Sequence, residues 1–248
     1  MPLKETLRTP KFWLIAVPVV IVLAVVVGPF VYINFIKEDA PDPLTFDDIG
    51  TATSTTAGAT DTTAADDGSA TVSDGIEGTW EVAAGSTAGY RATEVLFGQS
   101  TEAAGRTEDV TGTMTIEGTS ATEAGFEVDL TTLESDEAQR DGQVQNRILE
   151  TSQFPTATFE LTEPVDFGTE PADLEEITAQ ATGDLTVHGV TNSVTIDLTA
   201  RRNGDAIEVT GSVPITWSDF DINDPSGGPA QVEDSGAMEF ALTFSKTA

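Results

Sequence analysis

Residues 177–198 read ITAQATGDLTVHGVTNSVTIDL, in which apolar and polar side chains alternate on both sides of His188-Gly189. Strict alternation is typical of half-buried antiparallel strands, because successive side chains of a strand point to opposite faces. His188-Gly189 interrupts the alternation and marks a turn. The stretch therefore predicts two strands joined by a turn, each with one apolar and one polar face.

The same period of two runs through the rest of residues 76–248. From Thr79 onward we count about eight or nine such segments, separated by turn signals of which Asn203-Gly204 is a strong hairpin sequence. Residues 136–149 form the one predicted helical interruption, with apolar Val144 and Ile148 four positions apart. The alternating apolar positions outside the quoted stretch include Phe126, Val128, Leu130, Ala157, Phe159, Leu161, Ile207, Val209, Val213, Ile215, Trp217, Met238, Phe240, Leu242 and Phe244.

This pattern predicts an all-β domain that is either a barrel or a sandwich. A barrel has the advantage that closure removes exposed strand edges. The interior of a barrel of about eight strands is either filled by side chains or holds one small ligand. The alternation leaves both questions open.

The composition excludes several classes of function. The chain has 248 residues, of which 11 are Lys or Arg and 42 are Asp or Glu, for a formal net charge of -31. Nucleic acid is excluded as a partner, because binding to its phosphates depends on Lys and Arg. The absence of Cys excludes disulfides and thiolate catalysis, and a single His excludes a multi-histidine metal site. We predict no cofactor and no metal site.

An apolar segment precedes the acidic part of the chain. Residues Phe12–Ile36 contain no charged side chain, and at ~1.5 Å per helical residue they exceed the ~30 Å hydrocarbon core of a bilayer. We predict a transmembrane helix; the alternative is a cleaved secretory signal, whose apolar region is normally only ~7 to 15 residues long. The basic side chains of residues 1–11 and the acidic flank after Lys37 place the N-terminus in the cytoplasm. The chain is thus expected to be a single-pass cell-membrane protein with an extracytoplasmic C-terminal domain.

The two segments after Ile36 differ in composition. Residues 37–75 are rich in Thr, Ala, Asp and Ser and hold one Lys against nine acidic residues. Low hydrophobicity with high charge cannot offset the entropy lost on ordering, so we predict a disordered tether here. Residues 76–248 hold seven basic and 32 acidic residues, a net charge of -25, and form the folded domain. We attribute this acidity to solubility rather than to a binding site.

Three sequence features point to chemistry of their own. His188 is the only histidine, and no G-x-S-x-G nucleophile motif accompanies it, which favours a structural role over hydrolysis. Asp219 begins an acidic stretch that lacks the Gly and Glu of an EF-hand loop, although an irregular calcium site within Asp219–Asp234 remains open. Arg140-Asp141 is either a solvent-exposed helical pair or a pair that fixes the helical segment across a barrel mouth.

Four short motifs resemble the YceI-like family. They are Gly78-Thr79-Trp80-Glu81-Val82, Arg140-Asp141, Phe154-Pro155-Thr156-Ala157-Thr158-Phe159 and Gly183-Asp184-Leu185-Thr186-Val187-His188-Gly189-Val190-Thr191. The last string is fairly specific, and the resemblance runs from about Gly78 to Lys246. It implies an extended lipocalin-like antiparallel β-barrel with one short helical excursion. It also implies binding of a polyisoprenoid or similar long-chain amphiphilic lipid in an apolar tunnel, without enzymatic activity.

The resemblance also implies a set of site residues. Typical members have histidines near the second strand, whereas residues 85–98 of this chain contain none. Tyr90 and Arg91 in that stretch, together with Arg140, are therefore predicted to meet the polar end of the ligand. The predicted lipid-binding wall consists of Phe126, Val128, Phe159, Leu161, Leu185, Val187, Ile196, Ile215, Phe240 and Leu242.

Two other functions remain as alternatives to lipid binding. The first is a structural or adhesion module with a filled core, whose acidic outer face meets wall polymers or cations. The second is a hydrolase that uses His188 and a nearby Asp.

Overall fold

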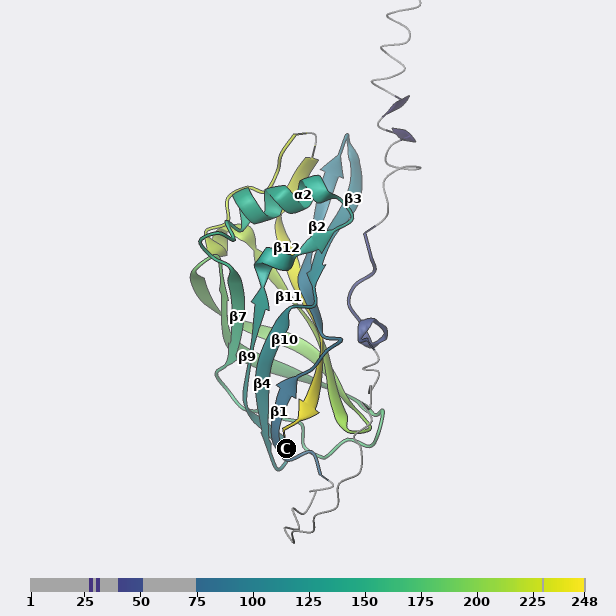
Figure 1. Ribbon diagram of the computed structural model, residues 1–248, viewed down its shortest axis with the longest axis vertical. Coiled ribbons are helices and arrows are strands. Elements are labelled where there is room, and N and C mark those ends of the chain that lie inside the picture. Colours follow the sequence, from purple (N-terminus) through teal and green to yellow (C-terminus); the bar gives the residue numbers. More distant parts are fainter. Residues whose placement is uncertain (1–26, 29, 32–39, 51–74, 229, 248) are drawn as a thin grey trace, which may run out of the picture.

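The strands close into a barrel. The structure is a computed structural model that describes residues 27–28, 30–31, 40–50, 75–228 and 230–247. Within these ranges eight antiparallel strands follow one another in the order β1-β4-β5-β7-β9-β10-β11-β12, and β12 pairs back onto β1 (Figure 1). The domain is therefore all-β and a barrel rather than a sandwich. The strands are β1 (Gly78–Val82), β2 (Thr87–Leu96), β3 (Gln99–Thr107), β4 (Val110–Glu117), β5 (Ser120–Asp129), β6 (Glu134–Ser135), β7 (Thr156–Leu161), β8 (Val165–Asp166), β9 (Glu176–Val187), β10 (Val190–Asn203), β11 (Ala206–Thr216) and β12 (Ala230–Lys246).

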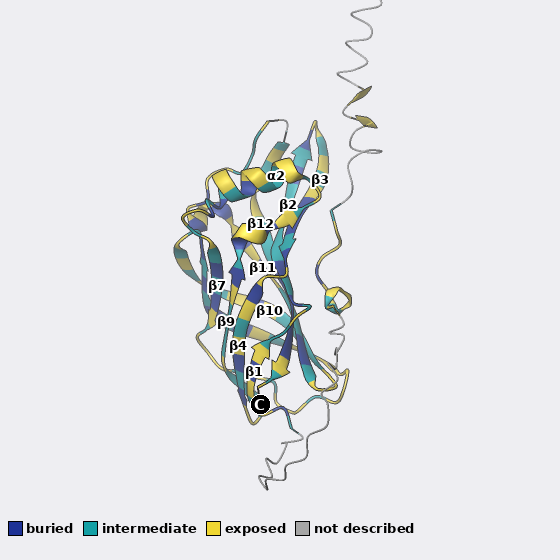
Figure 2. Ribbon diagram, in the orientation of Figure 1, coloured by how far each residue is buried: buried dark blue, intermediate teal, exposed yellow. Residues whose placement is uncertain are grey.

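Residues 177–198 lie within the predicted pair of strands. β9 and β10 pair antiparallel along their lengths, and Figure 2 shows buried and exposed residues alternating along the strands. His188 and Gly189 between them have positive φ values of 52° and 75°, as a two-residue turn of the primed type requires. Glycine is needed at the second position, because a Cβ on Gly189 would lie 2.6 Å from the ring of Phe154.

A helical segment covers one end of the barrel. At that end β12 pairs with β2, β2 pairs with β3, and the short β6 pairs with the end of β3. After β6 the chain forms α2 (Ala138–Gln143) and one wider helical turn, η5 (Val144–Ile148). These elements confirm the helical interruption predicted within residues 136–149. They lie across the end of the barrel near the tip of the β2–β3 hairpin (Figure 1), and we call this end the mouth.

The half of the barrel away from the mouth is filled by side chains. Trp80 of β1, Met114 of β4 and Leu242 of β12 are buried there in one apolar cluster. The indole Nε1 of Trp80 donates a hydrogen bond to the carbonyl oxygen of Ile76 at 2.9 Å. At ~25 cal/mol per Å² of buried apolar surface, this packing is the main stabilising contribution in that half.

Residues 40–50 lie along the outer face of the barrel (Figure 1), and we call them the strap. At one end of the strap, the backbone N–H of Gly50 donates to the carbonyl of Gly85 at 3.2 Å. Towards the other end, the guanidinium of Arg91 donates to the carbonyl of Pro41 at 2.7 Å. The strap therefore follows the barrel from its filled half towards the half that carries the mouth.

The strap corrects part of the prediction for residues 37–75. The guanidinium of Arg201 lies 4.2 Å from the ring centroid of Phe46, and the backbone N–H of Leu44 donates to the carboxylate of Glu239 at 3.4 Å. The prediction of a disordered tether is wrong for this part. Local composition does not reveal partners that lie far away in the sequence.

The predicted transmembrane segment lies mostly outside the described residues. Of Phe12–Ile36, the structure describes only residues 27–28 and 30–31. In the described part of the chain, no helix is both long and apolar enough to span a membrane. Residues 1–11, 37–39 and 51–74 also lie outside the described residues.

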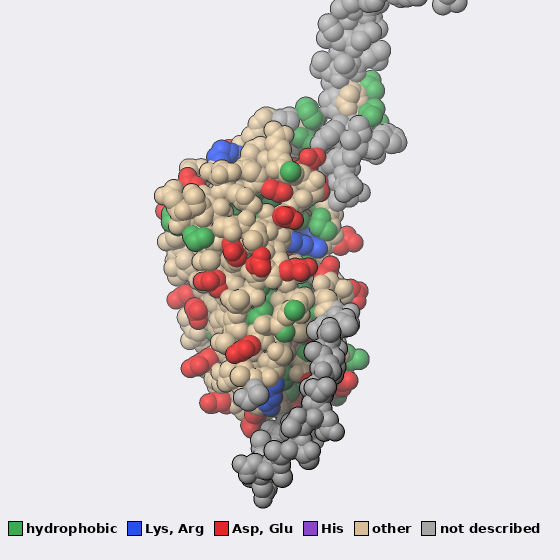
Figure 3. Space-filling model, viewed as in Figure 1, with side chains coloured by type: hydrophobic (Ala, Val, Ile, Leu, Met, Phe, Trp, Pro, Cys, Tyr) green, Lys and Arg blue, Asp and Glu red, His purple; other side chains and the backbone are tan. Residues whose placement is uncertain are grey.

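Acidic side chains are spread over the surface of the barrel. Figure 3 shows Asp and Glu side chains over most of the visible face, with few basic side chains between them. Dispersed charge of one sign keeps a protein soluble through mutual repulsion. On this face the acidic side chains are thus dispersed and do not gather into one patch.

Candidate functional site

The half of the barrel beneath the mouth is hollow. It holds a cavity of about 610 Å³, within the ~300 to 1,000 Å³ that is typical of small-molecule sites. The wall is mostly apolar, and small inward side chains leave the space open. Phe97 at the tip of the β2–β3 hairpin borders the outer end of the cavity and is 51% exposed. The wall includes Ala88, Ala92, Ala103, Val128, Ala157 and Leu185.

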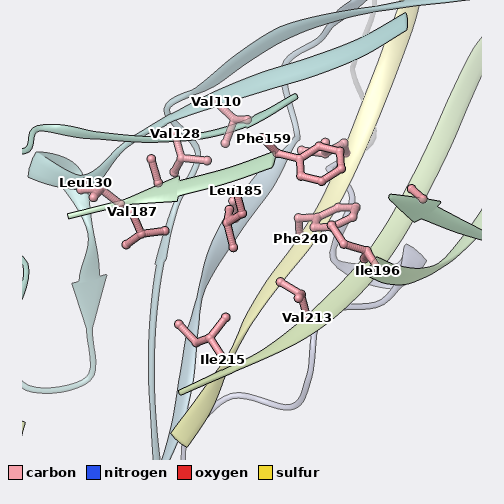
Figure 4. Packing of buried hydrophobic residues seen from close by; sticks show 14 of the residues in the cluster. Val110, Val128, Leu130, Phe159, Leu185, Val187, Ile196, Val213, Ile215 and Phe240 are labelled. Carbon is pink, nitrogen blue, oxygen red and sulfur yellow. The ribbon is translucent and has the colours of Figure 1, made fainter. Parts of the chain in front are cut away.

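Three phenylalanines cluster at the inner end of the cavity, where Phe126 and Phe240 border it and Phe159 packs against Phe126. The ring centroid of Phe126 lies 5.6 Å from that of Phe159 and 5.4 Å from that of Phe240. β5 and β12 are separated in the sheet by β1 and β4, so the contact between Phe126 and Phe240 spans the interior. Figure 4 shows Phe159 and Phe240 projecting into the same part of the barrel. We call these three residues the aromatic floor.

Two rings of the aromatic floor lie over glycines of neighbouring strands. A Cβ on Gly183 would lie 2.4 Å from the ring of Phe159, and a Cβ on Gly211 would lie 2.5 Å from the ring of Phe240. Side-chain carbons do not approach this closely in folded proteins. Glycine at these positions therefore lets each ring lie across the neighbouring strand, as in other aromatic–glycine pairs of curved sheets.

Polar groups gather beside the mouth. Arg140 donates from Nη2 to Oε1 of Glu94 at 3.3 Å and pairs through Nη1 with Asp136. Burial alone would lower the pKa of Arg140, but the two carboxylates raise it above its usual value. Burial also raises the pKa of the Tyr90 hydroxyl well above its usual range, and the nearby guanidinium of Arg140 opposes this shift only in part. The mouth thus offers a charged guanidinium and a neutral phenol.

The helical segment is fastened across the mouth on both sides. Arg140 ties it to Glu94 of β2, and Arg147 donates to the carbonyl of Pro225 in the loop before β12 at 2.8 Å. Of the two interpretations of Arg140-Asp141, the structure shows the one in which the helical segment is fixed across the mouth. The partners of Arg140, however, are carboxylates other than Asp141.

The structure divides the predicted wall residues into two groups. Four predicted wall residues border the cavity: Phe126, Val128, Leu185 and Phe240. The predicted head-group residues Tyr90 and Arg140 border it as well. The remainder are in the buried apolar cluster or pack against it without bordering the cavity: Phe159, Leu161, Val187, Ile196, Ile215 and Leu242. Alternation shows which side chains face the interior, but not the depth at which the interior is filled.

Arg91 lies on the outer face and not at the cavity. Successive residues of a strand point to opposite faces, so Tyr90 points inward and Arg91 outward. Its Nε lies 3.3 Å from Oε2 of Glu239, whose other oxygen is 3.2 Å from Nη2 of Arg106. The prediction that Arg91 meets the polar end of the ligand is therefore corrected: its partners are an outward carboxylate and the strap.

Sequence reasoning missed several residues of the cavity wall. Ala88 and Ala92 of β2 face the interior on either side of Tyr90, with Ala103 of β3 opposite Ala92. Val144 and Ile148 also border the cavity, although their spacing had indicated only a helix. Two signals could have indicated a hollow interior: the helical spacing of Val144 and Ile148, and the small side chains of Ala88 and Ala92 in β2.

The other chemical candidates make structural contacts. Nδ1 of His188 lies 3.2 Å from the carbonyl oxygen of Phe220, and its ring packs edge-on against Phe154, with 4.6 Å between centroids. The side chain and N–H of Ser226 lower the pKa of the exposed Asp224 carboxyl by hydrogen bonding. Among the described residues, no group of three or more His, Asp or Glu is placed to hold a metal ion. These contacts hold turns together.

Comparison with known proteins assigns the chain to a family. The sequence profile of the YceI-like domain matches residues 80–244, which is nearly the whole barrel. The chain belongs to the YceI-like family. A further relative, UPF0312 protein VPA0850 of Vibrio parahaemolyticus, is 33% identical over 102 residues, which make up 38% of this chain and 50% of that protein. This YceI-like chain thus matches only about half the length of the Vibrio protein.

One solved structure shares the fold of this YceI-like barrel. A polyisoprenoid binding domain from Saccharophagus degradans, implicated in plant cell wall breakdown, is 18% identical with a TM-score of 0.56. The match covers 69% of this chain and 99% of that domain. BcnA from Burkholderia cenocepacia is 22% identical with a TM-score of 0.49, covering 63% of this chain and 95% of BcnA. At 18% identity, the likeness to the Saccharophagus domain concerns the fold alone.

Proposed function

We propose that this YceI-like barrel binds a polyisoprenoid-type lipid in its cavity and sequesters or carries it. The observation that supports this most is the apolar cavity of about 610 Å³ between the mouth and the aromatic floor. A hydrocarbon chain that leaves water for this cavity gains ~25 cal/mol per Å² of buried apolar surface. The likeness to a domain described as polyisoprenoid binding adds support from outside the chain.

The polar groups at the mouth suit the head of such a lipid. The hydroxyl of Tyr90 and the guanidinium of Arg140 border the same cavity as the apolar wall. Both donate hydrogen bonds, so a hydroxyl head group would be accepted at the mouth while the chain extends towards the aromatic floor, whereas a phosphate would be repelled by the carboxylate of Glu94, which also borders the cavity. Arg91 has no part in this proposal.

The alternative of a structural or adhesion module agrees with only half of the barrel. A filled core is present away from the mouth, where Trp80 and Met114 are buried. The other half holds a wide apolar cavity, which a purely structural barrel does not need. Lipid binding is therefore the function that the site supports best.

We expect a prenyl lipid to co-purify with the full chain. The apolar cavity should retain its ligand through purification, because the chain of the lipid is withdrawn from water. Solvent extraction followed by mass spectrometry should detect the lipid in a near-stoichiometric amount. The proposal is contradicted by a chain that carries no prenyl lipid and takes up none from prenol-loaded vesicles.

We further propose that the protein works at the outer side of the cell membrane, with Phe12–Ile36 as its anchor. The strap supports this arrangement. Only residues 37–39 separate the apolar segment from the strap, and extended chain spans at most ~3.6 Å per residue, so this gap is on the order of 15 Å. Because the strap runs towards the mouth half of the barrel, it would keep the cavity close to the membrane.

Protease added to intact spheroplasts should release the barrel. The flank before the apolar segment has a net positive charge and the flank after it is acidic, so residues 37–75 and the barrel are expected outside the cytoplasm. Immunoblotting should show a fragment that starts within residues 37–75, and permeabilised cells should give the same fragment. Full protection of the barrel in intact spheroplasts would contradict the proposed topology.

A further inference from the structure

The interior of the barrel changes from hollow to filled at the aromatic floor. On the inner side of the floor, Leu242 and Phe244 of β12 are buried in the apolar cluster and do not border the cavity. On the mouth side, Phe240 of the same strand borders the cavity. The available space therefore ends within a few residues along one strand.

We propose that the aromatic floor limits the chain length of the bound lipid, an inference that rests on the proposed lipid-binding function. A carbon with its hydrogens takes up nearly the ~30 Å³ share of a water molecule, so about 610 Å³ holds on the order of 20 carbons. This corresponds to a geranylgeranyl chain. The remainder of a longer chain has no space in the barrel, because Phe126 and Phe240 meet across the interior.

The packing around the floor makes it a fixed stop. Phe126 contacts both other rings, and Phe159 and Phe240 lie against the backbone of Gly183 and Gly211. Behind the floor, the buried side chains of Leu242 and Phe244 fill the interior, so the rings have side chains and not open space on that side. The length limit is therefore a property of the fold.

A series of prenols tests this limit on the full chain. We would incubate the delipidated chain in detergent with an equimolar mixture of geraniol, farnesol, geranylgeraniol and solanesol, and measure the bound species by native mass spectrometry. The bound fraction should rise severalfold with each isoprene unit up to geranylgeraniol, and should not rise further for solanesol. A continued rise to solanesol overturns the length limit and leaves lipid binding standing. Failure to retain any prenol overturns lipid binding and the limit with it.

Substitutions in the floor test its role directly. Phe126→Ala opens the floor where the three rings meet. The ratio of bound geranylfarnesol to bound geranylgeraniol should therefore rise about tenfold over that of the wild-type protein. Phe126→Leu should give a smaller shift in the same direction and serves if the Ala variant does not fold. Phe244→Ala is the matched control, since it removes a buried ring beyond the floor and should leave the preference unchanged. An unchanged preference in both Phe126 variants overturns the proposal.

Discussion

Ala157→Phe is expected to lower the affinity for geranylgeraniol by roughly a hundredfold, with little change in the free energy of unfolding. Ala157 is 6% exposed, lies on β7 opposite Val128, and borders the cavity. A ring at this position occupies space that the lipid chain would use. Excluding about four methylene groups at ~0.8 kcal/mol each costs about 3 kcal/mol, which corresponds to the hundredfold loss. Displacement of a fluorescent prenyl probe and thermal unfolding would measure the two quantities.

Ala181→Phe is the matched control for this substitution. Ala181 is 4% exposed and belongs to the apolar cluster, but it does not border the cavity. A ring inserted into a filled core typically costs ~1 to 3 kcal/mol, or ~2 to 4 °C in Tm per kcal/mol for a domain of this size. Equal destabilisation by both substitutions, with lipid binding intact in Ala157→Phe, would show that the cavity is not the lipid site.

The fold could be predicted from the sequence because its signal is local. Each strand carries its own alternation, and turn signals such as His188-Gly189 and Asn203-Gly204 separate them without reference to the rest of the chain. Closure into a barrel depends on pairing between β1 and β12, which lie at opposite ends of the domain. The alternation alone did not distinguish a barrel from a sandwich, and only the resemblance to a family predicted this pairing.

The extent of the cavity could not be predicted in the same way. Whether Phe159 or Leu242 borders a cavity depends on the summed volume of side chains from many strands at one depth. Phe126 and Phe159 share the same alternation in sequence, and yet only Phe126 borders the cavity. The aromatic floor depends on contacts between strands that are not neighbours in the sequence, which a period of two does not encode.

The strap and the orientation of Arg91 show two different reasons for error. The strap was missed because acidic composition indicates disorder only when no partner is available, and its partner Arg201 lies about 150 positions later. The outward orientation of Arg91 was available from the sequence, since it stands between the inward Tyr90 and Ala92. The prediction for Arg91 relied on its charge, as a substitute for the missing family histidines, and not on the alternation.

The second large effect is expected on the outer face, where Glu239→Ala should lower the free energy of unfolding by about 3 kcal/mol. Glu239 is 4% exposed and accepts from Nε of Arg91 at 3.3 Å and Nη2 of Arg106 at 3.2 Å. Its removal leaves two guanidinium groups near each other without the carboxylate between them. Leu44 of the strap also loses its acceptor, so the strap should become more sensitive to protease. Chemical denaturation and limited proteolysis would measure these changes.

Glu102→Ala is the control for the loss of a carboxylate beside Arg91. Glu102 accepts from Nη1 of the same Arg91 at 3.0 Å but is 55% exposed as a side chain, and exposed ion pairs contribute only ~0 to 1 kcal/mol. Adding Arg106→Ala to Glu239→Ala should recover part of the lost stability, because it removes one of the two neighbouring guanidinium groups that Glu239 had separated. If Glu239→Ala costs no more than Glu102→Ala, the cluster does not stabilise the outer face, and the strap must be held by the stacking of Arg201 on Phe46 and by its backbone hydrogen bonds.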